Sequence, residues 1–206
     1  MTLGARAHPG PELSPGVLAA AGVGSLALGA VAGWSDLLLV VGGRVVPGWG
    51  VSAVLFVLAL VLWRAFVRAG RRVDAVLPPV VRPAWLRPVT VLLIVAAVSG
   101  IAWGALDDLI SDARYHVLRP TGPGGCMAVV RETSFLMIGD GEAYAVGRTG
   151  LAWGEAGSWV VDDGYRPVAA GTYRLDWERD GGLLVVSGSG TDPVVRGGMT
   201  DIDCGW

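Results

Sequence analysis

The stretch VTVLLIVAAVSGIAWGAL, from Val89 to Leu106, contains no charged residue and decides the class of this protein. A helix needs about 20 predominantly apolar residues to cross about 30 Å of hydrocarbon. Two further apolar stretches precede it, at residues 17–41 and 47–67. Tryptophans stand near both ends of the second and third stretches, as in the aromatic belts of membrane helices. The sequence therefore predicts three transmembrane helices within residues 17–111.

Arginine residues are concentrated between the second and third stretches. Residues 64–88 hold six arginines and a single acid, Asp74. Short loops rich in Arg or Lys stay on the cytoplasmic side of a membrane. We therefore expect this loop and the N-terminal tail, residues 1–16, to be cytoplasmic, and everything after the third stretch to be extracytoplasmic. The predicted location is the cell membrane, with several passes.

The first stretch has a second interpretation, as a cleaved signal peptide. Ala30-Val31-Ala32 is a small-residue pattern after an apolar run, which is typical of a signal-peptide cleavage site. Apolar residues resume at Leu37 to Val41, however, and the N-terminal region has little positive charge. A retained span is therefore favoured. Either alternative leaves the C-terminal part of the chain outside the cytoplasm.

Small residues recur with a period of four in the first stretch, and Gly29 and Gly33 form a GxxxG pair. Small residues let helices approach closely in lipid. These two glycines are candidates for a helix–helix contact, within the chain rather than between copies; the alternative is that a chain rich in Gly and Ala produces such spacing by chance. Asp36 is the only acid in the stretch; because it lies near the expected outer end, contact with interfacial water or Arg44 is favoured over a role in proton or ion transport.

From Cys126 onward, short apolar runs alternate with turn residues, after a Pro/Gly hinge at residues 112–125. Strands are predicted at 127–130, 134–138 and 142–146, with a turn at 139–141, and another pair within 151–161. Tyr173, Leu175 and Trp177 alternate with charged residues before an Asp-Gly turn and a return strand at 183–186, the pattern of a β-hairpin. Residues 126–206 are therefore predicted to form a small all-β domain, an antiparallel sandwich or barrel-like fold.

Cys126 and Cys204 are the only cysteines, and they stand near the two ends of this β region. A small domain has a modest core and gains stability from a covalent link. Disulfides persist in oxidising compartments, and the distribution of arginine independently predicts such a compartment for this domain. The sequence therefore predicts a disulfide bond between Cys126 and Cys204.

The sequence gives little support for catalysis or for a cofactor. His8 and His116 are the only histidines, the pattern G-x-S-x-G is absent, and two cysteines with one C-terminal histidine do not make a typical zinc site. No catalytic residue, metal ligand or cofactor is predicted. Trp153 and Trp159, in a Gly-rich stretch, are the candidate ligand-facing residues, although packing in the core is the favoured alternative for both.

The amino-acid composition indicates the kind of genome that encodes the chain and the kinds of partner that it can bind. All 16 basic residues are Arg, and Lys, Asn and Gln are absent, as a high-GC bacterial genome would produce. From residue 111 to the end, 13 acids outnumber 8 arginines, which argues against binding of nucleic acid.

The leading hypothesis is a non-enzymatic bacterial envelope membrane protein that presents its outer β domain to a ligand, a membrane protein or another cell-envelope partner. The alternatives are an accessory subunit of a transport or secretion complex and, third, an extracytoplasmic membrane-anchored hydrolase.

Overall fold

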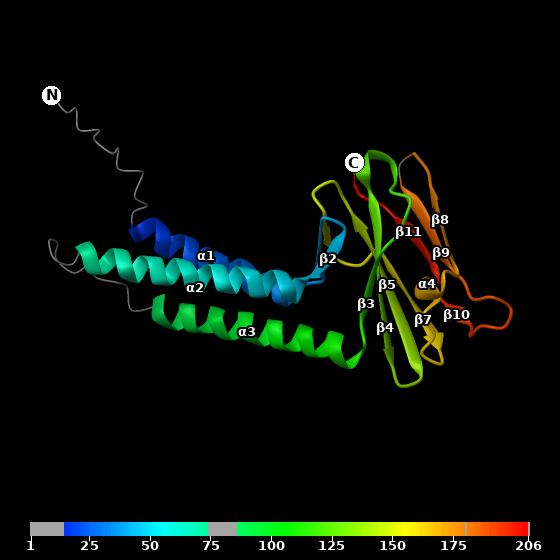
Figure 1. Cartoon of the computed structure of the whole chain (residues 1–206), viewed down its shortest axis with the longest axis horizontal. Helices are drawn as coiled ribbons and strands as arrows, with labels where there is room; N and C mark the ends of the chain where they lie inside the picture. Colours follow the sequence, from blue (N-terminus) through cyan, green and yellow to red (C-terminus); the bar gives the residue numbers. More distant parts are fainter. Residues whose placement is uncertain (1–14, 74–85, 180, 206) are drawn as a thin grey trace, which may run out of the picture.

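Three long helices lie side by side, and the β-strands gather at one end of them (Figure 1). The computed structural model describes residues 15–73, 86–179 and 181–205. The helices are α1 (Pro15–Gly33), α2 (Gly48–Val73) and α3 (Leu86–Ile110). Each is long and apolar enough to cross a membrane, as the sequence predicts. The arginine-rich segment at 64–88 is helical up to Val73 and again from Leu86; its middle, 74–85, lies outside the described residues.

The first apolar stretch is shorter as a helix than predicted. Helix α1 ends at Gly33, and Leu37–Val41, predicted to complete the first span, instead forms strand β1. This strand turns at Gly42 and Gly43, whose φ angles of 59° and 78° suit a tight hairpin, and pairs with β2 (Arg44–Pro47). Asp36 is consequently an exposed residue in the link between α1 and β1, outside any helix.

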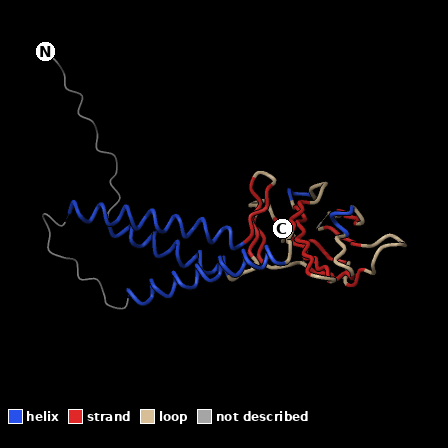
Figure 2. The backbone as a smooth tube through the Cα atoms, turned by 60° about the horizontal axis from the view of Figure 1, so that its bottom comes forward, coloured by secondary structure: helices blue, strands red, loops and turns tan. Residues whose placement is uncertain are grey.

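The strands, red in Figure 2, form three sheets, and all of their pairings are antiparallel. The first has the order β2-β1-β6, the second β10-β7-β5-β4-β3, and the third β11-β9-β8. The remaining strands are β3 (Arg114–Val117), β4 (Met127–Phe135), β5 (Ile138–Val146), β6 (Leu151–Trp153), β7 (Gly157–Asp162), β8 (Tyr173–Trp177), β9 (Gly182–Val186), β10 (Val195–Arg196) and β11 (Met199–Ile202), and the short helices are η1 (Pro123–Gly125) and α4 (Pro167–Ala170). Residues 37–47 and 114–117, expected in the membrane region and the hinge, thus belong to the sheets.

The central five-stranded sheet has apolar side chains on both faces. On one face, residues such as Val130 and Trp159 pack with Leu184 and Ile202 of the third sheet. On the other face, Val129 and its neighbours pack with Leu38 and Ala152 of the first sheet. Successive residues of a strand point to opposite faces, so this one sheet separates two small cores.

The longest hairpin differs from the prediction in the position of its turn. Strand β4 continues to Phe135, the turn is Leu136–Met137, and β5 begins at Ile138, whereas the sequence predicted a turn at 139–141. Gly141 lies inside β5, where a Cβ atom would overlap the indole of Trp159 on the neighbouring strand. The glycine thus makes room for a large core side chain and does not mark a turn.

The later predictions for the β region agree with the structure. Tyr173 pairs with Val186 and Trp177 with Gly182, in the predicted hairpin, and Tyr173, Leu175 and Trp177 are more buried than the charged residues between them. Asp180, in the predicted turn, lies outside the described residues. Cys126 and Cys204 lie at disulfide distance, with Cα atoms 5.9 Å apart.

Candidate functional site at the junction of helices and sheets

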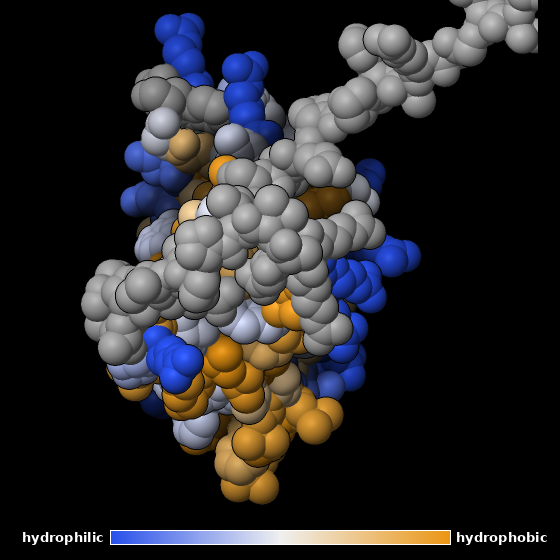
Figure 3. All heavy atoms as spheres, turned by 90° about the vertical axis from the view of Figure 1, so that its left-hand side faces the viewer, coloured by the Kyte–Doolittle hydropathy of each residue, from blue (hydrophilic) through white to orange (hydrophobic). Residues whose placement is uncertain are grey.

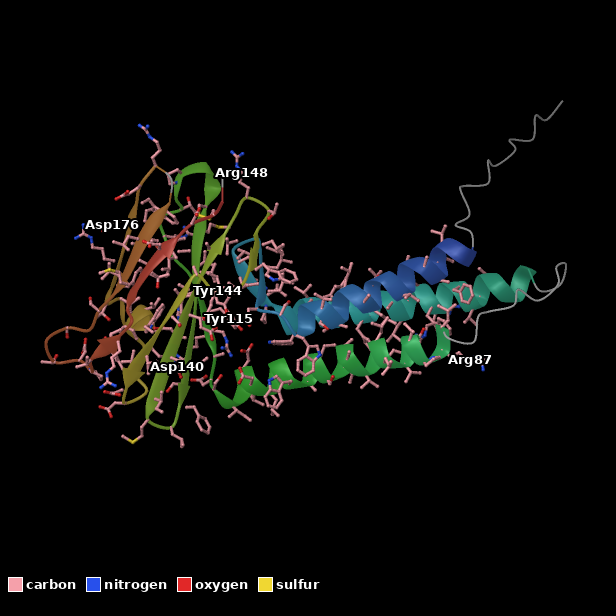
Figure 4. All side chains as sticks on the ribbon, turned by 180° about the vertical axis from the view of Figure 1, so that it is seen from behind. Arg87, Tyr115, Asp140, Tyr144, Arg148 and Asp176 are labelled. Carbon is pink, nitrogen blue, oxygen red and sulfur yellow. A yellow bond between two sulfur atoms is a disulfide. The ribbon has the colours of Figure 1, made fainter. Side chains whose placement is uncertain are left out.

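A cleft of about 290 Å³ lies where the ends of the helices meet the central sheet. We call it the junction cleft. Its lining includes Trp34, Asp36, Trp49, Trp103, Asp107, Asp108, Tyr115, Arg131, Glu142 and Tyr144. These residues come from the α1–β1 link, the start of α2, the end of α3 and strands β3, β4 and β5. Figure 4 shows two of them, Tyr115 and Tyr144, at the side of the sheet that faces the helices.

Arg131 lines this cleft and is only 15% exposed. Its Nη2 donates to Asp107 Oδ2 at 2.6 Å and to Asp108 Oδ1 at 2.9 Å, and its Nε donates to the same Asp108 oxygen at 3.2 Å. On the sheet itself, Nη1 lies 3.4 Å from both oxygens of Glu142. One guanidinium therefore joins the last turn of α3 to strands β4 and β5.

Asp108 connects further elements to this arginine. Its Oδ2 accepts a hydrogen bond from Trp49 Nε1 at 2.7 Å and another from the Tyr115 hydroxyl at 3.0 Å. The Tyr144 hydroxyl donates in the same way to Glu142 at 2.7 Å. Charge-assisted hydrogen bonds of this kind are shorter and stronger than neutral ones. The network ties α2, α3, β3, β4 and β5 together at one point.

The two tyrosines have raised pKa values. Burial raises the pKa of Tyr115, and the negative charge of Asp108 raises it further. Burial and the charge of Glu142 do the same for the pKa of Tyr144. For Arg131, burial on its own would lower the pKa, but Glu142 and the other anionic neighbours raise it above the ordinary arginine value. At neutral pH both phenols therefore keep their protons and Arg131 keeps its charge.

The cleft has an excess of negative charge. Four carboxylates, from Asp36, Asp107, Asp108 and Glu142, stand against the single guanidinium of Arg131, a formal balance of −3. A second cavity of about 440 Å³ lies on the other side of Arg131, along β5 and β7, and Asp140 and Glu155 add to its lining. The sheet surface facing the helices is thus acidic on both sides of Arg131.

The two tryptophans predicted to face a ligand lie in different environments. Trp153 is exposed at the end of β6, where it pairs with Leu37 of β1. Trp159 is 2% exposed and belongs to the core between the second and third sheets, the alternative that the sequence favoured, and it also contributes to the lining of the second cavity. Its large apolar side chain fills the space left by Gly141. Trp153 and Trp159 do not come together in one site.

The GxxxG pair lies in a contact between helices of this chain. A Cβ atom on Gly29 would lie 3.4 Å from the Cβ atom of Leu55, and one on Gly33 would lie 3.1 Å from the Oγ atom of Ser52. Both of these neighbours belong to α2. Gly33 also approaches the backbone of Gly100 on α3. The small residues of α1 thus let the three helices pack closely.

His116 is part of β3 and lies near Glu132, with Nε2 3.5 Å from Glu132 Oε2. Glu132 is buried, and its two oxygens accept hydrogen bonds from the backbone N–H groups of Val168 and Ala169 at 2.7 and 2.9 Å. These bonds hold the first turn of α4 against the sheet, so the carboxylate has a structural role. In the parts of the chain that the structure describes, no group of three or more His, Cys, Asp or Glu residues could hold a metal ion.

The residues of the junction cleft were not predicted as a site from the sequence. Asp107 and Asp108 directly follow the third apolar stretch, and Arg131 is one arginine among many. Their one sequence signal is that charges of both kinds interrupt apolar segments: an acid pair directly follows the stretch 89–106, in the last turn of α3, and an arginine stands within β4. Comparison with family models, with curated proteins and with solved structures gives no match for this chain.

Proposed function

We propose that this chain is a non-enzymatic membrane-anchored binding protein of a bacterial envelope, with its β region on the extracytoplasmic side. Three apolar helices and the arginine-rich segment at 64–88 support this orientation. The pair of Cys126 and Cys204 at disulfide distance is consistent with an oxidising compartment. The finer step of the proposal is that the junction cleft binds the cationic group of a ligand.

The observation that carries this step is the combination of acids and aromatic rings in one cleft. Carboxylates attract a cation, and the attraction grows where water is partly excluded. Tryptophan and tyrosine rings add attraction through their electron-rich faces. Arg131 is already surrounded by Asp107, Asp108 and Glu142, whereas Asp36 lies exposed at the rim of the cleft. A small ligand with a quaternary or primary ammonium group fits this chemistry.

Binding can be tested on the full chain in a maltoside detergent, which carries no cationic headgroup. Tetramethylammonium chloride should bind in calorimetry and raise the melting temperature, whereas the same concentration of sodium chloride should not. Asp36→Asn removes one charge and should weaken binding at least about fivefold, the equivalent of about 1 kcal/mol for one ion pair at 4 Å in water. Asp176→Asn, an exposed acid on β8 at the far face of the sheets (Figure 4), is the matched control and should have no effect. Equal binding by both variants would contradict the proposal.

The orientation has its own test. A cysteine placed at Ser158, which is exposed on β7, should react with an impermeant thiol reagent in intact cells. A cysteine placed at Ala75, in the arginine-rich loop outside the described residues, should be protected. The reverse pattern would contradict the extracytoplasmic placement of the β region.

The alternative of an accessory subunit loses its expected interface. An accessory subunit needs a helix face that docks on a larger membrane protein, and the small-residue face at Gly29 and Gly33 packs on α2 of the same chain. Co-purification in mild detergent separates the two functions: a stable stoichiometric membrane complex would favour the subunit, and an uncomplexed chain that binds the ammonium probe would favour the binding protein.

A further inference from the structure

The turn between β4 and β5 exposes four consecutive large apolar side chains. Phe135 is 52% exposed, Leu136 85%, Met137 67% and Ile138 55%. We call these residues the apolar tip. A run of this length on the surface of a protein is unfavourable in water unless another apolar phase covers it.

The apolar tip lies beside the end of α3. The backbone N–H of Ser134 donates to the carbonyl of Ser111 at 2.7 Å, and Ser111 directly follows the last residue of α3, Ile110. The apolar tip begins one residue after this hydrogen bond. The Arg131–Asp107 contact, three residues earlier in β4, fixes the same strand to the last turn of the helix.

Apolar side chains continue from the helix toward the apolar tip. Leu109 and Ile110, the last two residues of α3, are both exposed. In Figure 3, apolar side chains gather along the lower side of the molecule, the side on which α3 and the β4–β5 turn lie in Figure 1. The apolar tip therefore continues the exposed apolar surface of α3 beyond the end of that helix.

The backbone of the apolar tip is held in place. Ile138 pairs with Asp162 of β7, and the carbonyl of Met137 accepts a hydrogen bond from Gly164 at 3.2 Å. Ordered nine-residue strands lead into and out of the turn. Because the turn cannot fold back without breaking these bonds, its side chains stay presented, and the backbone needs no further ordering when they are covered.

We propose that the apolar tip inserts into the surface of the bilayer that α3 crosses, at the boundary between headgroups and acyl chains. The inference rests on the membrane-spanning role of the helices in the proposed function. Insertion is driven by apolar contact rather than by charge, since the strands beside the tip carry acids, Asp140 and Asp162. Acidic neighbours give no attraction to anionic headgroups, so phosphatidylcholine alone is a sufficient surface.

Spin labelling of the full chain in phosphatidylcholine nanodiscs tests the proposal. Single cysteines at Leu136 and, as controls, at Leu92 and Val194 are labelled without reductant, so that the bonded cysteine pair stays intact. Leu92 is exposed on α3, and Val194 is an equally exposed apolar residue in the loop between β9 and β10, at the end of the molecule away from the helices (Figure 1). Accessibility to oxygen, which concentrates in lipid, is compared with accessibility to a water-soluble nickel chelate.

We expect the label at Leu136 to favour oxygen, as the label at Leu92 does, by at least about threefold over the label at Val194. A water-like label at Leu136 beside a lipid-like label at Leu92 would overturn the inference and leave the spans intact. A water-like label at Leu92 would instead contradict the proposed function. Low accessibility to both reagents at Leu136 would show that a second copy of the chain covers the apolar tip, which also overturns the proposal.

Discussion

Replacing Arg131 with methionine should loosen the attachment of the sheets to the helices. The substitution keeps the approximate volume of the side chain but leaves Asp108 and Glu142 without their cation. Removing one partner of a buried ion pair costs about 3–5 kcal/mol, whereas exposed pairs are worth about 0–1 kcal/mol. Asp108 retains Trp49 and Tyr115 as donors. We therefore expect a loss of about 2–3 kcal/mol, between these two limits.

The assay is thermal unfolding of the full chain in a mild detergent, followed by tryptophan fluorescence. For a chain of this size, 1 kcal/mol corresponds to about 2–4 °C in Tm, so Arg131→Met should lower Tm by about 4–12 °C. Arg174→Met is the matched control: Arg174 is 77% exposed and pairs with the exposed Asp176, so this substitution should cost no more than about 0.5 kcal/mol.

A second substitution in the same network should have a smaller effect on stability. Asp107→Asn removes a carboxylate that is half exposed while Asp108 continues to hold Arg131, so the loss should stay below about 1 kcal/mol. Equal Tm values for Arg131→Met and Arg174→Met would refute the reasoning, because the buried network would then contribute no more than a surface pair.

Three further predictions follow from the β region. Gly141→Ala should destabilise the protein by about 1–3 kcal/mol because the new methyl group overlaps the Trp159 indole, whereas Gly190→Ala, with open space around it, should be tolerated in the same melts. Spectrophotometric titration should show late ionisation of two of the four tyrosines, with Tyr115→Phe and Tyr144→Phe each removing one late step. Since both folded-state pKa values are raised, their contribution to stability is complete below about pH 10 and is lost as the pH rises above it. Mass spectrometry of protein prepared without reductant should find no free thiol, and two alkylatable thiols would disprove the disulfide.

The predictable parts of the fold are those with a local sequence signal. The long apolar helices follow from hydropathy alone, and the strict alternation from Tyr173 to Trp177 gave the correct register of β8. Leu37–Val41 was assigned wrongly because a run of Leu and Val suits both a membrane helix and a buried strand. What decides between them is pairing with β6, which lies more than 100 residues later in the chain. Local hydropathy contains no such information.

The junction cleft was beyond prediction for the same reason. Arg131 meets Asp107 and Asp108 only because β4 crosses the end of α3, and Asp36 reaches the same cleft only because α1 ends early. An arginine in a strand and an acid pair in the last turn of a helix each have an ordinary explanation as surface residues when they are read separately. Their shared role appears only when the tertiary arrangement is known.

Two contacts of different chemistry join the end of α3 to strand β4. Arg131 binds the carboxylates of its last turn, and Ser134 binds the backbone of Ser111 just after it. These contacts lie along one strand, β4, so they fix the direction of that strand relative to the helix as well as its position. Strand β4 contributes side chains to both cores, Val130 to one and Val129 to the other, so it packs against both of the other sheets. If Arg131 is removed, we therefore expect the whole β region to change its angle to the helices, and with it the position of the apolar tip. A spin label at Leu136 in the Arg131→Met variant should accordingly lose oxygen accessibility even at temperatures where the protein remains folded.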